Sequence, residues 1–274
     1  MRDLLTCPTP RLTDWLGVWA IETLAAQQLL AAVRDLDWQA HLASYEATPK
    51  PVAASSAYST VEAKGRQLAV IPIAGTMMKS RSSMGGTSTV ETRRQIRAAA
   101  KDSEVAGILL RIDSPGGTVA GTYDLAGEVA NARRQKPVVA QIEDVGASAA
   151  YWVASQASRV YASSPTAMVG SIGTLLVVSK GQRDGLAVFR SGPHKGVGID
   201  GEITEDQAAH LQSLVNGWQS EFNSAVQGGR RLTAEQIAEV STGATWLAGR
   251  AQQLRLLDGV QSIEQTIDLL ATMR

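Results

Sequence analysis

The sequence has almost no cysteine or histidine, no excess of either charge and no long hydrophobic run. Of its 274 residues one is cysteine, Cys7, and three are histidine. An internal disulfide is therefore excluded, and a Cys/His zinc site is not expected. Lysine plus arginine number 26, as do aspartate plus glutamate, which removes any general attraction to nucleic acid or to an anionic membrane. We expect no metal and no nucleic-acid partner.

The most hydrophobic early stretch, VWAIETLAAQQLLAAV, contains Glu22, Gln27 and Gln28. A membrane-spanning helix needs roughly 20 predominantly apolar residues, so we expect no membrane span. The N-terminal MRDLLTCPTPRLTDW has scattered charges and two prolines where a secretory signal needs an apolar core. We therefore expect a cytoplasmic protein, which the scarcity of cysteine also favours.

The pattern of apolar residues divides the chain into three parts. From about Leu12 to Tyr45 they recur near helical spacing, which predicts an N-terminal helical segment over 1–46. Residues 47–63 are rich in Pro, Ala, Ser and Thr and are predicted to form a linker. Residues 64–274 are then the main domain, long enough to bury a core of its own.

Strand-like and helical runs alternate through the main domain. The predicted strands are RQLAVIPIAG, VAGILLRI, PVVAQI, RVYA, TLLVV and LAVFR. A helix is predicted after each of the first three strands, and the first of these helices starts at Ser88 or Thr89. From about Thr204 the chain is predicted to be mainly helical. This alternation predicts an α/β fold with a parallel sheet joined by right-handed crossovers.

Two short motifs follow predicted strands, where such a fold places its chemistry. DSPGG, 113–117, has two glycines that allow a sharp turn and leave backbone amides open to a ligand, as an oxyanion hole requires. Alone, it is also an ordinary turn. In GASAAYW, Ser148 is the only hydroxyl among Gly146, Ala147, Ala149 and Ala150. It is either a nucleophile with space around it or part of a closely packed helix.

Two further motifs offer partners for such a serine. MVGSIGT contains Ser171 between glycines, and RSGPHKG contains His194 and Lys195. Each has a simpler interpretation, a turn serine and a solvated lysine. A serine needs a base, and a lysine base must be neutral, although with an ordinary pKa of about 10.4 only about one lysine in 2,500 is neutral at pH 7. Burial can shift that balance, and physics alone does not select Lys195 over His194.

Taken in order, DSPGG, GASAAYW, VGSIG and SGPHKG resemble the signal peptide peptidase A family of Ser–Lys proteases, especially its phage-head members. The resemblance runs from about Leu68 to Ile267 and includes IPIAGTM and ATWLAGRAQQLRLLDGV. It implies a crotonase/Clp protease-like fold of repeated β-β-α units with a parallel sheet. One departure is Arg255, which stands where the family often has a glycine.

The resemblance implies a role for each candidate residue. Ser148 matches the nucleophile, Lys195 the general base and Ser171 the serine that supports that lysine. The amides of Gly116, Gly117 and Ala149 match the oxyanion hole. No histidine lies at 170–176, where Clp-type relatives carry theirs, so His194 is left as a possible substrate contact.

The function implied is a serine endopeptidase without cofactor, acting on polypeptides and forming a homo-oligomer, in some members with a dyad shared between subunits. We expect a phage or prophage head maturation protease that processes scaffold and capsid proteins in the host cytoplasm or within the prohead. Two alternatives remain: a soluble signal-peptide-peptidase-like enzyme that degrades peptides, and a catalytically inactive crotonase-like assembly protein.

Overall fold

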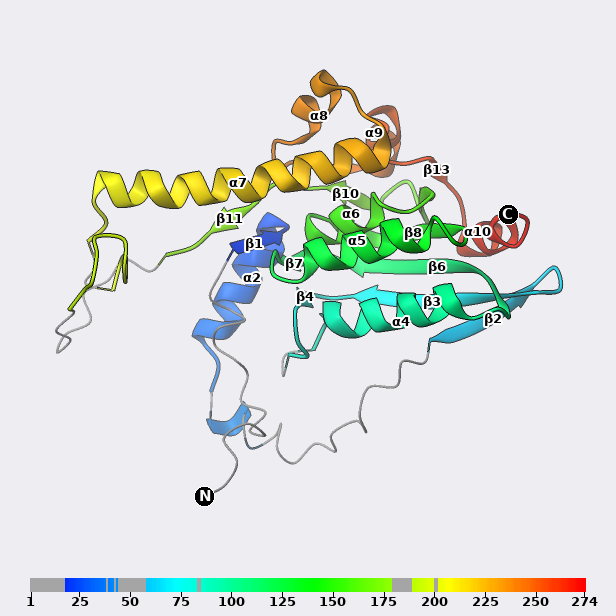
Figure 1. The fold of residues 1–274 in the computed structure, drawn as a ribbon, viewed down its shortest axis with the longest axis horizontal. Coiled ribbons are helices and arrows are strands. Elements are labelled where there is room, and N and C mark those ends of the chain that lie inside the picture. The colour runs from blue at the N-terminus through cyan, green and yellow to red at the C-terminus, as the bar shows by residue number, and fades with distance from the viewer. Residues whose placement is uncertain are drawn as a thin grey trace.

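The computed structural model describes residues 18–37, 39–41, 43, 58–82, 85–178, 189–199 and 202–274. At its centre is a mostly parallel sheet flanked by helices (Figure 1). The predicted α/β class with a parallel sheet is confirmed.

The central sheet has the order β12-β10-β8-β6-β3-β2. Its strands are β2 (Ser59–Ala63), β3 (Arg66–Ala74), β6 (Val105–Ser114), β8 (Val138–Ala147), β10 (Met168–Gly170) and β12 (Thr245–Leu247). The four inner strands are parallel, and β2 and β12 pair antiparallel at the two edges. Beside β8 lies β9 (Arg159–Ala162), which also pairs with β13 (Gly259–Val260).

Helices cover both faces of this sheet, which explains why its inner strands are largely apolar. On one face lie α4 (Thr89–Lys101), α5 (Thr122–Ala132) and α6 (Ala149–Ala154), and on the other lies α10 (Ile263–Leu270). Successive residues of β6 point to opposite faces. Leu110 therefore packs in the large cluster under α4 and α5, while Leu109 packs with Leu270 of α10.

Most of the predicted elements are present. The helix predicted to start at Ser88 or Thr89 is α4, capped by the Ser88 hydroxyl, which accepts a hydrogen bond from the Glu91 amide. The predicted strand TLLVV is reduced to β11 (Leu175–Leu176). Most of LAVFR lies outside the described residues, so the strand expected there remains a prediction.

A second sheet has the order β11-β1-β7-β4-β5. It contains β1 (Val18–Ile21), β4 (Met77–Met78), β5 (Thr87–Ser88) and β7 (Gly116–Thr118). The helical prediction is wrong for Val18–Ile21, because these residues form a strand paired on both edges, with β7 and β11. The helix begins after them, as α2 (Thr23–Arg34), capped by the Glu22 carboxylate.

The predicted linker also contains structure. Its last part forms β2, and residues 47–57 lie outside the described residues, as do 12–17 of the predicted helical segment. The boundaries of the N-terminal segment and the linker stay predictions.

The C-terminal third is mainly helical, as predicted: α7 (Glu205–Arg230), α8 (Ala234–Val240), α9 (Ala248–Gln253) and α10. The N-terminal end of α7 projects from the body of the described chain together with the segment 189–199 (Figure 1), and the buried residues of this helix, Phe222 and Val226, lie in its C-terminal half. Phe222 stacks on Trp152 of α6 with ring centroids 4.5 Å apart. Within the described ranges, no helix has the length and apolar character needed to cross a membrane.

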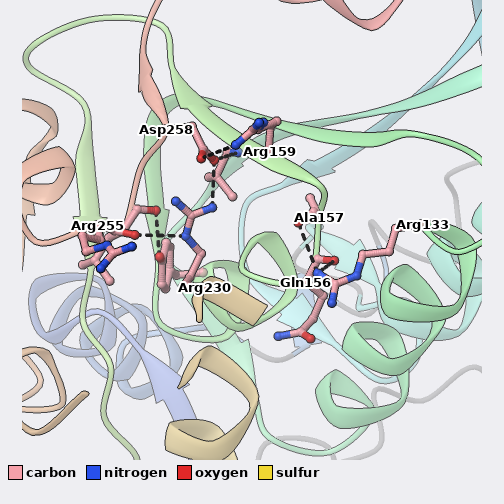
Figure 2. Close-up of polar contacts among 10 residues, drawn as sticks. Arg133, Gln156, Ala157, Arg159, Arg230, Arg255 and Asp258 are labelled. Carbon is pink, nitrogen blue, oxygen red and sulfur yellow. Dashed lines mark hydrogen bonds and ion pairs between the residues drawn. The ribbon is translucent and has the colours of Figure 1, made fainter. Parts of the chain in front are cut away.

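A buried ion pair holds the C-terminal end of α7 against β9. The Arg230 guanidinium donates to Asp258 Oδ2 at 2.8 Å and to the Arg255 carbonyl oxygen at 3.1 Å (Figure 2). The Asp258 carboxylate also accepts from the Val160 amide at 2.7 Å. Arg255 has φ 63°, so the loop takes the left-handed conformation even with arginine at the position where the resemblance led us to expect glycine.

Replacing Asp258 by asparagine is expected to lower the free energy of unfolding by about 3–5 kcal/mol at pH 7, since it leaves a buried guanidinium without its counter-charge. The Arg230 side chain is only 8% exposed. Urea unfolding measures this effect. The matched control is Glu239→Gln in the exposed Arg250–Glu239 pair, which is expected to cost less than about 1 kcal/mol.

The same substitution has an expected pH dependence. Burial alone would raise the pKa of Asp258, but the hydrogen bond and charge of Arg230 outweigh it and hold that pKa below 3.8. A carboxyl group whose pKa is lower in the folded state stabilises the fold at pH values above its unfolded-state pKa. That stabilisation is lost as the pH falls through the folded-state pKa. The difference between wild type and Asp258→Asn should therefore shrink below about pH 4. A difference that stays constant down to pH 2.5 would show that the charge of Asp258 does not matter.

Candidate active site

Ser148 lies in the sharp turn between β8 and α6. Its backbone has φ 54° and ψ −121°, a region that a residue with a side chain rarely adopts. Such conformations cost of order 1–3 kcal/mol, and they persist where the surrounding structure enforces them, often at functional sites. A strained serine between a strand and a helix is also the arrangement that exposes a nucleophile in other hydrolases.

The surrounding backbone fixes this turn on both sides. The Ser148 amide donates to the Gly170 carbonyl at 2.7 Å, and the Trp152 amide donates to the Ser148 carbonyl at 2.8 Å. The hydroxyl donates to the Gly173 carbonyl at 3.4 Å, which is a long and weak hydrogen bond. Ser148 is fully buried, so its hydroxyl oxygen is held in place, but its hydrogen-bonding capacity is poorly satisfied.

The DSPGG loop lies against this turn. Asp113 Oδ1 accepts from the Val145 amide of β8 at 3.2 Å. The Ser114 hydroxyl donates to the Gly75 carbonyl at 2.6 Å and accepts from the Gly116 amide at 3.2 Å. Ser114 thus sets the shape of the loop, a role that the sequence analysis missed because it assigned the motif only to its glycines.

The two glycines of this loop are needed for different reasons. Gly116 has φ 105°, and a Cβ on it would lie 2.3 Å from the Ala20 carbonyl oxygen, 2.9 Å from the Ala149 nitrogen and 3.0 Å from Ser148 Cβ. A Cβ on Gly117 would lie 1.8 Å from the Met77 carbonyl oxygen. The absence of a side chain on Gly116 lets the loop pack directly against Ala149 and Ser148, and the absence of one on Gly117 lets it pack against Met77. The predicted oxyanion role of the Gly116 amide is not supported, because that amide already donates to the Ser114 hydroxyl.

Ser171 occupies the corresponding place on the neighbouring strand. Strands β8 and β10 are parallel, with Ala147 opposite Gly170, so Ser148 and Ser171 each follow the carboxyl end of an inner strand. Ser171 has φ 51°, is 4% exposed and donates its amide to the Ala244 carbonyl at 2.7 Å. The structure brings these two serines and the DSPGG loop together.

The structure does not bring Lys195 and His194 to this place within one chain. Lys195 is exposed, and its amide donates to the Gly192 carbonyl. His194 Nε2 lies 3.3 Å from Asp206 Oδ2, and its ring centroid lies 4.6 Å from that of His210. Segment 189–199 therefore lies at the N-terminal end of α7, at the left of Figure 1.

The middle of α7 lies near Ser148. Gln219 accepts from the Thr174 amide at 2.9 Å, next to Gly173, the acceptor of the Ser148 hydroxyl. Asp206 and Gln219 are separated by about 20 Å along the helix at 1.5 Å per residue. No hydrogen bond joins Lys195 to Ser148 among the described residues.

Within the part of the chain that the structure describes, no three His, Cys, Asp or Glu side chains are grouped so that they could bind a metal ion. The polar groups around Ser148 are hydroxyls, backbone amides and carbonyls, which suit acyl chemistry at a carbonyl group.

Comparison with known proteins assigns the family. The model of peptidase family S49 matches residues 130–274, more than half of the chain. The chain belongs to peptidase family S49. This confirms the resemblance on which the site residues were predicted, because the S49 match covers Ser148, Ser171 and Lys195.

The relatives of this S49 chain include cellular and phage proteases. It is 28% identical over 210 residues to Protease 4 of Salmonella typhi, 31% over 210 residues to Head-tail preconnector protein GP5 of Enterobacteria phage P21, and 33% over 188 residues to Capsid assembly protease C of Escherichia phage lambda. These alignments cover 74%, 72% and 63% of this chain. The chain spans only 34%, 39% and 42% of the three relatives.

Among solved structures, this chain is similar to a protein described as an enoyl-CoA hydrotase/isomerase family protein from Silicibacter pomeroyi. The structural alignment covers 80% of this chain and 84% of the other. The TM-score is 0.49 and the sequence identity 16%.

Proposed function

We propose that this chain is a serine endopeptidase in which Ser148 is the nucleophile and Lys195 the general base. Ser171 supports the lysine, and the amides of Gly117 and Ala149 stabilise the oxyanion. The Gly116 amide, which the resemblance had also assigned to the oxyanion hole, is left out because it donates to the Ser114 hydroxyl. The observation that carries the proposal is the strained, buried turn at Ser148, held against the DSPGG loop.

The chemistry follows from this arrangement. Neutral Lys195 takes the proton of the Ser148 hydroxyl, and the oxygen attacks the substrate carbonyl carbon. The charge that develops on the carbonyl oxygen is stabilised by amides already in position, each worth about 3–4 kcal/mol of barrier in other enzymes. The protonated lysine donates to the leaving amine, and water then hydrolyses the acyl-enzyme.

We infer that the lysine comes from a neighbouring subunit. Its own chain holds Lys195, which is exposed, in the segment beside Asp206 at the N-terminal end of α7. Asp206 lies about 20 Å along the helix from Gln219, the residue of α7 that binds Thr174 near Ser148. A lysine works as a base only when neutral, and removal from water favours the neutral form. Contact between the projecting end of α7 and the next copy would bring the lysine to a serine and exclude water in one step. A homo-oligomer is then required for activity.

The biological role that we propose is cleavage of scaffold and capsid proteins during phage head assembly, in the host cytoplasm or within the prohead. Two relatives named for head-tail connection and capsid assembly support this role. The similarity to Protease 4 supports the second candidate, the degradation of free peptides. Both candidates share the same substrate chemistry, an extended polypeptide bound by its main chain.

The experiment that tests the proposal is incubation of the purified oligomeric chain with casein, followed by mass spectrometry of the peptides released. We expect time-dependent cleavage by wild type and slower but retained cleavage by His194→Ala, because in this proposal the imidazole is at most a substrate contact and not the base. Loss of cleavage in His194→Ala together with an active Lys195→Ala would assign the base to the histidine. No cleavage by wild type would favour the inactive assembly protein.

A further inference from the structure

The N-terminal strand β1 fills the gap between two strands at the candidate active site. Trp19 and Ala20 pair antiparallel with Thr118 and Gly117 of β7, and Trp19 also pairs with Leu175 of β11. Both partners belong to the catalytic neighbourhood, since β7 contains the glycines of DSPGG and β11 follows Gly173. This short strand is therefore an inner strand of a sheet whose other strands come from the main domain.

The register of β1 directs one carbonyl group at the predicted oxyanion amides. The Glu22 amide donates to the Pro115 carbonyl at 2.8 Å, and the Val119 amide donates to the Val18 carbonyl at 2.9 Å. Hydrogen-bonded pairs alternate along an antiparallel ladder, so Ala20 and Gly117 are the hydrogen-bonded pair between these two. The Ala20 carbonyl thus faces the Gly117 amide.

The same carbonyl lies next to the nucleophile. The Ala20 oxygen, the Ala149 nitrogen and Ser148 Cβ all lie within 3.0 Å of the point where a Cβ on Gly116 would stand. The Ala20 carbonyl oxygen therefore faces the Gly117 amide and lies near the Ala149 amide and Ser148. A scissile carbonyl has to approach the same amides and the same serine.

The side chains of β1 are buried on both faces. Ala20 is fully buried in the main core cluster, together with Met77 and Ala149. Its neighbours Trp19 and Ile21 point to the opposite face, where they pack with Met78. The pocket at Ala20 is thus small and enclosed, while the flanking positions accept large apolar side chains.

We propose that β1 occupies the peptide-binding groove of this peptidase as an intramolecular stand-in for substrate, with Ala20 at the residue whose carbonyl is attacked. The inference rests on the proposed function and adds the substrate class to it. Substrates are extended segments with alanine, glycine or serine at that residue and large apolar residues on either side. Such a segment gains access only when β1 leaves the groove.

The test measures peptide binding without catalysis. The probe is a fluorescein-labelled peptide GVWAIE, the sequence of residues 17–22, added to full-length chain carrying Ser148→Ala, and binding is read by fluorescence anisotropy. In this background Ala20→Lys forces a charge into a closed pocket and should expel β1, whereas Ala20→Ser should keep it. Because a tethered strand competes at an effective concentration of about millimolar, we expect Ala20→Lys to bind the peptide at least tenfold more tightly.

Two peptides check the register. The peptide GVWKIE should bind the Ala20→Lys chain at least tenfold more weakly than GVWAIE, and GVWGIE should bind nearly as well. Equal binding of all three peptides, or equal binding of GVWAIE by the Ala20→Lys and Ala20→Ser chains, would overturn the proposal. Far-UV circular dichroism and thermal unfolding establish that both chains are folded.

A reversible lock covers the case in which Ala20→Lys does not fold. Val18 and Leu176 are paired between β1 and β11, and because Val18 directs its carbonyl toward β7, they form the non-hydrogen-bonded pair, whose Cα separation of about 4.5 Å suits a disulfide. In a Cys7→Ser, Ser148→Ala background, the oxidised Val18→Cys/Leu176→Cys chain should bind GVWAIE at least tenfold more weakly than the same chain reduced. Equal affinity in the two states would contradict the proposal.

Failure of this inference can be distinguished from failure of the proposed function. Binding to a Ser148→Ala chain needs no chemistry, so an inactive assembly protein could still show redox-dependent peptide binding. Conversely, casein cleavage by wild type combined with lock-independent binding would leave the peptidase intact and remove β1 from its groove.

Discussion

Replacement of Ser148 by alanine is expected to lower kcat/KM for casein-derived peptides by at least about 10³-fold, since loss of the nucleophile alone removes most of the catalysis in serine peptidases. The residue is fully buried, and its hydroxyl makes one long hydrogen bond, to the Gly173 carbonyl. The loss should therefore come without a large change in stability. Steady-state kinetics and urea unfolding measure the two quantities.

The strained backbone at Ser148 adds a second expectation. Ser148→Gly should be as inactive as Ser148→Ala, but its free energy of unfolding should rise by about 1 kcal/mol, because glycine adopts φ 54° without the steric cost. The matched control is Ser158→Ala at the opposite end of β8, where the hydroxyl accepts from the Val138 amide. It should keep full activity. Activity retained in Ser148→Ala would remove Ser148 from the chemistry.

Replacement of Lys195 by alanine is expected to lower kcat/KM by a similar factor, at least about 10³-fold, because the hydroxyl then lacks its base. Lys195→Arg should be equally inactive, since a guanidinium is never neutral at working pH and cannot accept the proton. Neither change should alter the unfolding of a single chain, because Lys195 is exposed. Kinetics on both variants, with exposed Lys101→Ala as control, measure this. A Lys195→Arg protein with near wild-type activity would show that the side chain only binds substrate.

The part of the site built on strand ends could be predicted from the sequence. DSPGG follows β6, Ser148 follows β8 and Ser171 follows β10, and these three strands are adjacent and parallel. Alternating strands and helices already predict that such strand ends meet at one edge of the sheet. The strained backbone of the two serines could not be predicted, because it depends on hydrogen bonds to Gly170 and Ala244.

The strand β1 could not be predicted, because its sequence continues into a helix with the same apolar spacing. What makes Val18–Ile21 a strand is the presence of open edges on β7 and β11, which lie roughly a hundred residues or more further along the chain. Local propensity is a weak prior where tertiary pairing is available. Glu22 could have indicated the boundary, since its side chain caps α2 through the Leu24 and Ala25 amides.

The position of Lys195 relative to Ser148 could not be predicted from the sequence either. Its proposed role rests on the family resemblance of SGPHKG, and that resemblance does not reveal whether the lysine serves its own chain. That is decided by α7, whose capping box at Thr204 and Gln207 starts a long helix directly after the lysine segment. The helix keeps the segment at a distance from its own serine.

The central claim, a serine and a lysine contributed by neighbouring subunits, is tested most directly by mixing the two inactive proteins. Ser148→Ala and Lys195→Ala chains are unfolded together, refolded at equal concentrations and assayed on casein. If each site pairs one chain's serine with the next chain's lysine, random assembly leaves about a quarter of the sites complete and should recover about a quarter of the wild-type activity. An oligomer that contains both chains and shows no activity above either variant alone would contradict the account.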